Sequence, residues 1–237
     1  VPFFVSPRGY GLMVENTERI VFDLCTGDSP TWSVEVWSST AHLVLFSGQP
    51  LEVVQRYTEH VGRPVMPPDW ALLPWIGIKG GTDHVKAKVE ELRDAEIPLG
   101  AIWSEDWPGE SKSAFTGNNL NYHWIWDEEH YPALPDMIAG LHADDIRFLA
   151  YFNPFVLQKF EHWETCAAEG YLPKTRDGDL YEMTAVTGKG SVIDVTNPDA
   201  VKYLQGFLQT GRDLGFDGWM ADFAEWVPFD AVFHDGR

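Results

Sequence analysis

The sequence has few residues of several kinds, and each shortage excludes a class of protein. Its two cysteines, Cys25 and Cys166, are too few and too far apart for a disulfide framework or a cysteine metal motif, so both are expected as small buried side chains. No apolar run approaches the roughly 20 residues that span a bilayer, and no membrane association is expected. Seventeen basic residues stand against 36 acidic ones, a net charge of −19. This balance argues against a nucleic-acid partner and assigns the acidic surface to solubility.

Common catalytic motifs are also missing. There is no Gly-x-Ser-x-Gly elbow, which leaves serine hydrolysis poorly supported. The segment Lys79-Gly80-Gly81-Thr82 lacks the GxGxxG spacing of a dinucleotide site. The histidines are scattered without an HxxxH-type pair. We therefore expect no cofactor and no metal. A metal-dependent barrel enzyme stays open as an alternative, because carboxylates at strand ends can hold a divalent ion.

The start of the chain, Val1-Pro2-Phe3-Phe4, has neither an initiator Met nor the basic n-region of a signal peptide. We expect a cytoplasmic location and a numbering that begins inside a longer protein. Aromatic residues, by contrast, are plentiful, with 11 Trp and 14 Phe. Stacked aromatics line sugar-binding sites, although large cores also use them.

The first fifty residues predict short antiparallel strands. Alternating, β-branched and aromatic runs are separated by turn residues, at 3–5, 9–14, 19–22, 32–37 and 42–46. An amphipathic helix is expected over 50–60, followed by a Pro-rich linker over 62–69. We interpret residues 1–66 as the C-terminal part of an N-terminal β-sandwich domain plus a linker.

Beyond the linker, strands alternate with helices. Apolar strands are predicted at 72–78, 99–103, 147–152 and 216–221. Helices are expected to begin near Thr82-Asp83, Pro135 and Asn197-Pro198, with Thr82-Asp83 and Asn197 as caps, and a short helix is expected over 162–169. A long aromatic loop is predicted before Pro135, and irregular structure after the short helix to about residue 190. Continuous apolar runs indicate a parallel sheet covered by helices. Polar residues follow the strand ends, where a barrel keeps its active site. Residues 67–237 are therefore predicted to form the first half of a (β/α)₈ TIM barrel. A doubly wound α/β sheet is the alternative.

Three carboxylates stand at these strand ends, namely Glu105, Asp106 and Asp222. A retaining glycosidase needs one carboxylate as nucleophile and a second carboxyl group as acid and base. Asp222 fits the nucleophile, since its strand fixes it and its aromatic neighbours exclude water. Glu105 and Asp106 lie beside Trp107, as sugar hydroxyl acceptors beside a stacking platform would. A helix cap or an ion pair is the structural alternative for each carboxylate.

Several segments together resemble glycoside hydrolase family 31, the retaining α-glycosidases with a sandwich before a (β/α)₈ barrel. The resemblance covers essentially the whole chain, and its segments keep the family's order and spacing. They are Pro2-Phe3-Phe4-Val5-Ser6-x-Arg8-Gly9-Tyr10-Gly11, Gly77-Ile78-Lys79-Gly80-Gly81-Thr82, Ile102-Trp103-Ser104-Glu105-Asp106-Trp107, Tyr151-Phe152-Asn153-Pro154, Asp194-Val195-Thr196-Asn197-Pro198 and Gly218-Trp219-Met220-Ala221-Asp222-Phe223.

The resemblance implies an O-glycosyl hydrolase that works by double displacement through a glycosyl ester on Asp222. Glu105 matches a residue that contacts the sugar, and the acid/base is implied to follow residue 237. The substrate-binding residues are then expected to be Glu105, Asp106, Trp107, Lys79, Asn119, Tyr122, Trp219 and Phe223. The partner is a carbohydrate, an α-glycoside; the oligomeric state is open.

Within the family, the likeness is greatest to the sulfoquinovosidase branch, which releases a 6-sulfonated glucose. That branch carries an Arg and, three residues on, a Trp, which grip the sulfonate. Here these positions hold Asn119 and Tyr122, and an Asn cannot replace a bidentate guanidinium. A neutral α-glucoside is therefore expected, with the sulfonated sugar and a non-catalytic carbohydrate-binding relative as alternatives. Residues 1–237 alone are expected to be inactive and prone to aggregation, because half a barrel leaves an open sheet edge.

Overall fold

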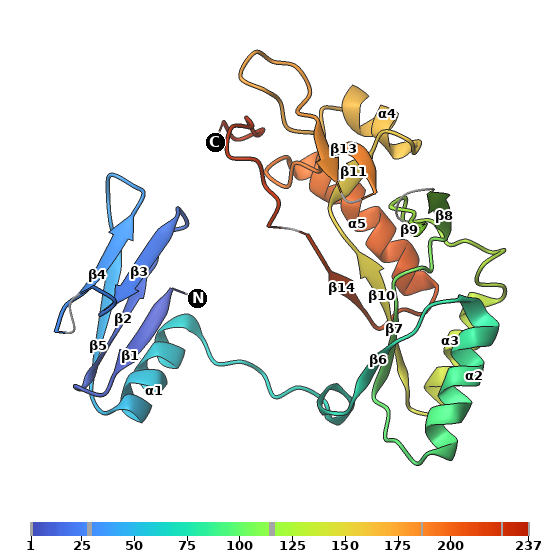
Figure 1. Ribbon diagram of the computed structural model, residues 1–237, viewed down its shortest axis with the longest axis horizontal. Helices are drawn as coiled ribbons and strands as arrows, with labels where there is room; N and C mark the ends of the chain where they lie inside the picture. The colour runs from blue at the N-terminus through green and yellow to red at the C-terminus, as the bar shows by residue number, and fades with distance from the viewer. Residues whose placement is uncertain (1, 28–29, 114–116, 186, 224, 237) are drawn as a thin grey trace. The chain divides into compact units, whose positions relative to one another are not determined.

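The chain divides between Met66 and Pro67 in the computed structural model, which describes residues 2–27, 30–113, 117–185, 187–223 and 225–236. Residues 1–66 form one compact unit and residues 67–237 a second (Figure 1). This division falls at the Pro-rich linker. The interpretation of the first unit as the end of a sandwich domain stays a prediction.

The first unit contains a three-stranded antiparallel sheet of β1 (Phe3–Ser6), β2 (Tyr10–Val14) and β5 (Leu43–Ser47). Strands β3 (Ile20–Leu24) and β4 (Trp32–Val36) pair separately as a hairpin. Helix α1 (Pro50–Val61) packs on the three-stranded sheet with Val53 fully buried and Tyr57 stacked on Phe3 at 4.1 Å between ring centroids. Five strands and one helix are thus where the alternating pattern predicts them.

The second unit is built on a four-stranded parallel sheet. Its strands are β6 (Trp75–Gly77), β7 (Ala101–Ser104), β10 (Arg147–Phe152) and β14 (Gly218–Ala221). Their order across the sheet is their order along the chain. A doubly wound sheet reverses its strand order at a switch point, and these four strands show no reversal. The strand–helix–strand prediction is confirmed to this extent.

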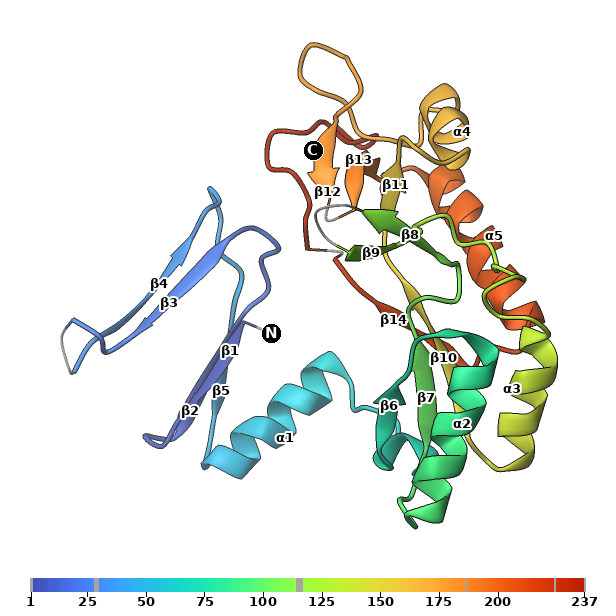
Figure 2. The ribbon, with the colours of Figure 1, turned by 45° about the vertical axis from the view of Figure 1, so that its right-hand side comes forward.

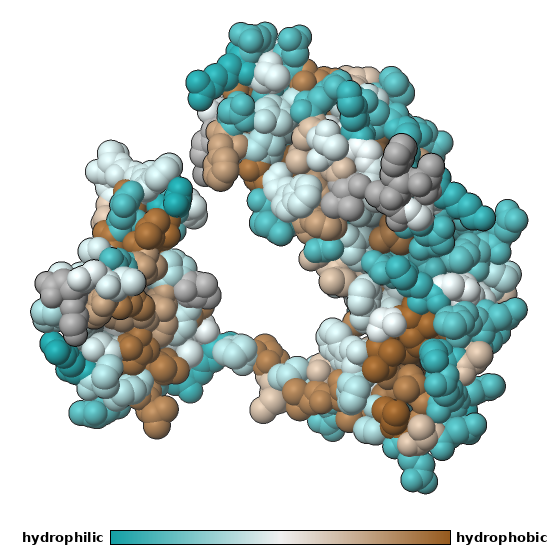
Figure 3. Space-filling model, in the orientation of Figure 1, coloured by the Kyte–Doolittle hydropathy of each residue, from teal (hydrophilic) through white to brown (hydrophobic). Residues whose placement is uncertain are grey.

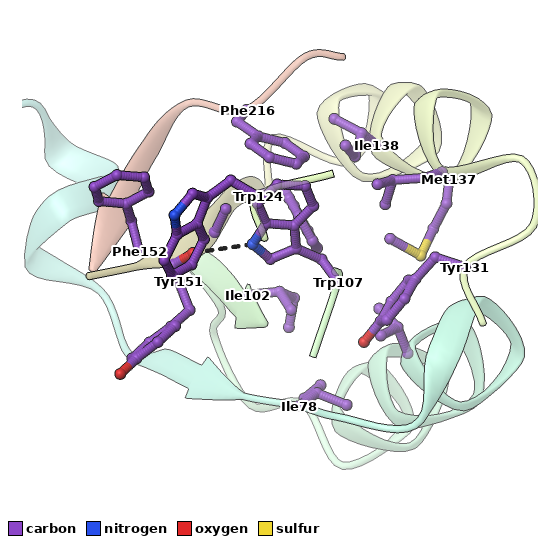
Figure 4. Close-up of a cluster of buried hydrophobic side chains, with 14 of the residues drawn as sticks. Ile78, Ile102, Trp107, Trp124, Tyr131, Met137, Ile138, Tyr151, Phe152 and Phe216 are labelled. Atoms are coloured by element: carbon purple, nitrogen blue, oxygen red, sulfur yellow. Dashed lines mark hydrogen bonds between the residues drawn. The ribbon is translucent and has the colours of Figure 1, made fainter. Parts of the chain in front are cut away.

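Helices α2 (Gly81–Asp94), α3 (Leu134–Ala143) and α5 (Pro198–Asp213) cover one face of this sheet (Figure 2). The main core lies between them and the strands, with Val85, Ile102 and Ile138 almost completely buried. Figure 4 shows how Trp107 and Phe216 fill the same core, their ring centroids 5.1 Å apart. Packed apolar side chains therefore fill the helix-covered face of the sheet.

Two small sheets lie in segments that the sequence predicts as loop or irregular structure. One is a hairpin of β8 (Glu110–Ser113) and β9 (Gly117–Leu120), inserted between β7 and α3. The other consists of β11 (Phe155–Leu157), β13 (Gly188–Val192) and β12 (Met183–Ala185), with α4 (His162–Ala168) beside it. The loop prediction was wrong for both, because backbone pairing holds these strands and their sequences show little alternation.

The sequence predicts the cap of α5 correctly and the cap of α2 wrongly. Asn197 caps α5 as predicted, accepting a hydrogen bond from the backbone N–H of Asp199 at 3.0 Å. Helix α2 instead begins after Gly80, whose φ of 105° is left-handed, and Thr82 donates its hydroxyl to the carbonyl of Pro132. Capping by Thr82 is thus a wrong prediction. Cys166 is buried as predicted and Cys25 is exposed against prediction, since it lies in the turn after β3.

Exposed apolar residues lie at both edge strands of the parallel sheet. Trp75 in β6 is 46% exposed and Met220 in β14 is 42% exposed. Apolar surface also appears as brown patches on the second unit in Figure 3. No helix among the described residues has the length and apolarity needed to cross a bilayer.

A glycine substitution tests the start of α2. Gly81 has a φ of 86°, and an added Cβ would lie 2.3 Å from the carbonyl oxygen of His130. Gly81→Ala should therefore lower the free energy of unfolding by about 2 kcal/mol or more, measured by urea unfolding of the full-length protein. Gly140→Ala in α3 is the control, because its Cβ meets nothing within 4 Å. It should be neutral or stabilising by up to about 1 kcal/mol. Equal effects of the two changes would contradict the backbone contact.

Candidate active site

The open face of the parallel sheet carries the candidate site. Successive side chains of a strand point to opposite faces, so residues two apart share a face. Gly77, Trp103 and Leu149 are register partners, and an added Cβ on Gly77 would lie 2.8 Å from the Trp103 ring. Counting two residues at a time toward the carboxyl end from these positions, and from Gly218 in β14, stays on the same face. The count reaches four side chains at the carboxyl ends: Lys79, Glu105, Tyr151 and Asp222.

Asp222 follows β14 directly and is half-buried. Its backbone N–H donates to the carbonyl oxygen of Phe152 at 2.9 Å, so the sheet ladder continues through it. Its Oδ2 accepts the hydroxyl of Tyr151 at 2.9 Å, and its Oδ1 accepts the N–H of Phe223 at 3.1 Å. Phe223 has a φ of 60°, a left-handed conformation that a bulky residue rarely adopts and that turns the chain away at this point. The carboxylate is therefore fixed in place by backbone and side chain.

Tyr151 connects Asp222 to other buried polar groups. Its hydroxyl accepts the side-chain N–H of Asn153 at 3.3 Å, and the ring of Tyr122 lies beside its own ring, with 6.2 Å between the centroids. Asn153 is completely buried, and both tyrosines are 3% exposed. Burial raises the pKa of Tyr151 well above its ordinary value, so that its phenol stays neutral and can donate.

Lys79 and Glu105 form an ion pair next to this group. The distance between Lys79 Nζ and Glu105 Oε1 is 3.0 Å, with side chains 52% and 26% exposed. The hydrogen bond to Glu105 raises the pKa of Lys79 above its ordinary value against the opposing effect of burial. The ammonium group of Lys79 therefore stays charged at neutral pH, and it lies against the carboxylate of Glu105 on the open face.

Asp106 lies on the opposite, helix-covered face and is 1% exposed. Its Oδ2 accepts the N–H of Gly80 and Nε2 of His130, each at 2.7 Å. Its Oδ1 accepts the hydroxyls of Ser104, at 2.8 Å, and Tyr131. Burial alone would raise the pKa of Asp106, but these hydrogen bonds together lower it below its ordinary value. Its prediction as a sugar ligand is corrected: Asp106 ties the start of α2 to β7.

Two of the predicted stacking residues also lie away from the open face. Trp107 is 3% exposed, and its Nε1 donates to the backbone oxygen of Tyr151 at 3.0 Å (Figure 4). Trp219 alternates to the helix side of β14, where its Nε1 lies 3.4 Å from a Cβ built on Gly211 of α5. Both are core residues. Strand alternation turns Trp219 toward the helices, whereas Trp107 lies in the turn after β7, which directs its ring into the core.

Three predicted substrate-binding residues remain, and each lies differently with respect to the hydrogen bonds around Asp222. Asn119 is in β9, opposite Ser111, on a hairpin whose following residues lead to Tyr122. The Tyr122 ring stacks on Trp124 at 5.7 Å between centroids, which leaves only its hydroxyl for the polar network. Phe223 is partly buried against the main core. The role of these three residues in sugar binding stays a prediction.

Tyr151 and Asn153 belong to the site but are missing from the predicted ligands. Their segment ends a predicted strand, and the alternation that places Leu149 on the open face would also have placed Tyr151 there. Among the residues that the structure describes, no group of three or more His, Cys, Asp or Glu side chains could hold a metal ion. The site is thus one of carboxylates, phenols and an ammonium group.

Carboxylates at the ends of parallel strands, held by neutral donors, are typical of hydrolases that act on sugars. The model of the family described as "Glycosyl hydrolases family 31 TIM-barrel domain" matches residues 64–236. The chain therefore belongs to glycoside hydrolase family 31, as its motifs predict.

Similar proteins span several activities of the family. The sulfoquinovosidase of Escherichia coli (strain K12) is 32% identical over 99% of this chain and 35% of its own length. The α-xylosidase XylQ of Lactiplantibacillus pentosus is 28% identical over 100% of this chain and 31% of its own. A solved family 31 sulfoquinovosidase from E. rectale, bound to an aza-sugar inhibitor, has a TM-score of 0.85 and 29% identity over 100% of this chain and 36% of its own. The chain spans about a third of each.

The four donors on Asp106 generate a prediction about stability. Asp106→Asn puts an amide N–H₂ against donors, so it should lower the free energy of unfolding by about 2–4 kcal/mol at pH 7. Because the pKa of Asp106 lies below its ordinary value in the folded protein, its stabilisation is complete above about pH 4 and is lost as the pH falls through the lower folded value.

The measurement is urea unfolding of the full-length protein and its variants between pH 3 and 7. The difference between wild type and Asp106→Asn should shrink on acidification. Glu105→Gln is the control, because the neighbouring carboxylate is half-exposed and makes one ion pair, worth about 1 kcal/mol or less. A pH-independent loss in Asp106→Asn would contradict the role of its charge.

Proposed function

We propose that the full-length protein is a retaining α-glycosidase in which Asp222 is the nucleophile. The supporting observation is its carboxylate at the carboxyl end of β14, on the open face of the sheet, held by the neutral donor Tyr151. The four parallel strands then form the first half of a (β/α)₈ barrel, whose active site lies at this edge. Residues 1–66 would be the end of a sandwich domain.

The proposed reaction is a double displacement. A carboxylate oxygen of Asp222 bonds to the anomeric carbon while the bond from that carbon to the aglycone oxygen breaks. A second carboxyl group, expected after residue 237, gives its proton to the leaving oxygen. Water, deprotonated by the same group, then attacks the anomeric carbon and releases Asp222. The two carboxyl groups of such a pair lie about 5–5.5 Å apart.

A neutral α-glucoside is the substrate that the charges favour. Lys79 is already paired with Glu105 at 3.0 Å, so an anionic sugar would have to compete with that carboxylate for the ammonium group. Asn119 offers no positive charge where the sulfoquinovosidase branch has Arg. A sulfonated α-glycoside remains the second candidate, because two relatives at 32% identity are sulfoquinovosidases. Cleavage of aryl α-glucoside, α-galactoside, α-xyloside and α-sulfoquinovoside by the full-length protein would decide between them.

Substitution of Asp222 tests the activity itself. Asp222→Ala removes the nucleophile, so kcat on the best aryl α-glycoside should fall roughly 1,000-fold or more while the protein stays folded. The wild type should also form a covalent adduct with 5-fluoro-α-D-glucosyl fluoride at Asp222, visible by peptide mass spectrometry.

Three other outcomes would contradict this proposal. Retained turnover in Asp222→Ala would sink the assignment. Binding of sugars without turnover in the wild type would favour a non-catalytic carbohydrate-binding relative. Loss of activity with a chelator would favour a metal-dependent barrel enzyme.

The hairpin residue Asn119 offers a test of substrate charge. Asn119→Arg adds a guanidinium group, so it should raise the ratio of kcat/KM for the sulfoquinovoside over the glucoside by about tenfold or more. Asn118→Arg is the matched control, since Asn118 points to the opposite face of β9 and donates to Glu110 at 2.7 Å. Equal ratios in the two variants would remove Asn119 from the substrate-binding residues.

A further inference from the structure

The hydroxyl of Tyr151 both donates and accepts a hydrogen bond. A phenol has one donor proton and two acceptor lone pairs. The proton goes to Asp222 Oδ2 at 2.9 Å, since a carboxylate only accepts. One lone pair accepts the N–H of Asn153 at 3.3 Å. The neighbouring phenol of Tyr122, whose ring centroid lies 6.2 Å from that of Tyr151, is the candidate donor for the second lone pair.

We propose that Tyr151 is a positioning residue for the nucleophile, and that Tyr122 and Asn153 act through it as a two-donor support. This inference rests on the proposed function of Asp222. The three residues come from two separate parts of the chain, the end of β10 and the segment after β9, and Tyr151 is the one that donates to the carboxylate. The group of Tyr122, Asn153 and Tyr151 is called the donor relay below.

The donor relay distinguishes the two oxygens of Asp222. Oδ2 is held by a phenol whose own oxygen accepts the N–H of Asn153 and, in this proposal, the hydroxyl of Tyr122. Hydrogen bonds in such a chain polarise one another. Oδ1 accepts only the neighbouring N–H of Phe223 among the described residues. Oδ1 is therefore the oxygen assigned to form the glycosyl ester, while Oδ2 keeps its bond to Tyr151 through the reaction.

The surroundings keep the relay dry and its phenols neutral. Tyr122 and Tyr151 are each 3% exposed, and Asn153 is completely buried. Burial raises the pKa of Tyr122 above its ordinary value, and the negative charges of Asp222 and Glu105 add to this rise. The donor relay contains no cationic side chain, and the ammonium group of Lys79 is paired with Glu105. Neutral donors thus hold Asp222 without a fixed positive charge that would oppose formation of a cationic transition state.

The relay predicts a loss of kcat without a loss of ground-state binding. Tyr151→Phe removes the donor but keeps the ring, so kcat on the best aryl α-glycoside should fall about tenfold. KM, and Ki for a competitive sugar inhibitor, should change less than about twofold, since the Tyr151 hydroxyl is occupied by Asp222. Inactivation by 5-fluoro-α-D-glucosyl fluoride, which reports attack by the nucleophile, should slow in proportion. A residue with only a packing role would lower the melting temperature and leave these rates unchanged.

A second variant covers the case in which Tyr151→Phe fails to fold. Tyr122→Phe keeps the stacked ring and removes one support, so kcat should fall about threefold in the same sense. The double variant should be no slower than Tyr151→Phe alone, because Tyr122 acts only through Tyr151. Tyr181→Phe is the control: it removes another tyrosine–carboxylate hydrogen bond, to Asp230 at 2.6 Å, outside the site. Its kcat should equal that of the wild type.

The outcomes separate the inference from the function on which it rests. If Asp222→Ala is inactive and Tyr151→Phe or Tyr122→Phe keeps wild-type kcat, the donor relay is overturned and the proposed function stands. If Asp222→Ala remains active, the proposed function itself is overturned. Additive losses in the double variant would also refute the relay, since they would show that the two hydroxyls act separately.

Discussion

The alternation of side chains along four parallel strands is the constraint on which the candidate site depends. A shift of one residue moves a side chain from the open face to the helix-covered face. The neighbours Glu105 and Asp106 show the effect most clearly, because they are the same kind of group with opposite surroundings. Glu105 is half-exposed and paired with Lys79, whereas Asp106 is 1% exposed and receives four hydrogen bonds. One carboxylate is available to a ligand, and the other is part of the framework.

The two faces support each other. The hydrogen bonds of Asp106 join β7 to the start of α2 and to His130, so they hold the strand that carries Glu105. The backbone oxygen of Tyr151 receives Nε1 of Trp107 from the core, while its hydroxyl reaches Asp222 on the other face. A buried polar group is costly unless it is fully paired, and here the pairing also fixes the geometry of the open face. Positioning of the site is thus a property of the core.

The sequence predicts the order of strands and helices well because the buried runs at 101–103 and 148–152 are continuously apolar. It does not predict the β8–β9 hairpin, since that segment is polar and rich in Gly and Asn, and only backbone pairing reveals it. Asp222 could be predicted from its place after an apolar strand. Nearness in sequence to the other candidates predicts Asp106, Trp107 and Trp219 as ligands, but it does not show which face each takes. That face depends on the strand register for Asp106 and Trp219, and on the turn after β7 for Trp107. The sequence does not predict Tyr151 as a site residue, because a tyrosine inside an apolar run has the pattern of a core residue.

The β8–β9 hairpin has a consequence for how such an enzyme can change. It carries Asn119, a residue expected at the substrate, and three positions later the chain places the ring of Tyr122 beside that of Tyr151, which donates to Asp222. A hairpin added at a strand end can ordinarily vary without disturbing the sheet beneath it. Here it is anchored on the inside by the stacked ring of Tyr122. A new substrate preference acquired through this loop would therefore alter turnover at the same time, and evolution of the loop would have to keep its inner end constant while its tip diverges.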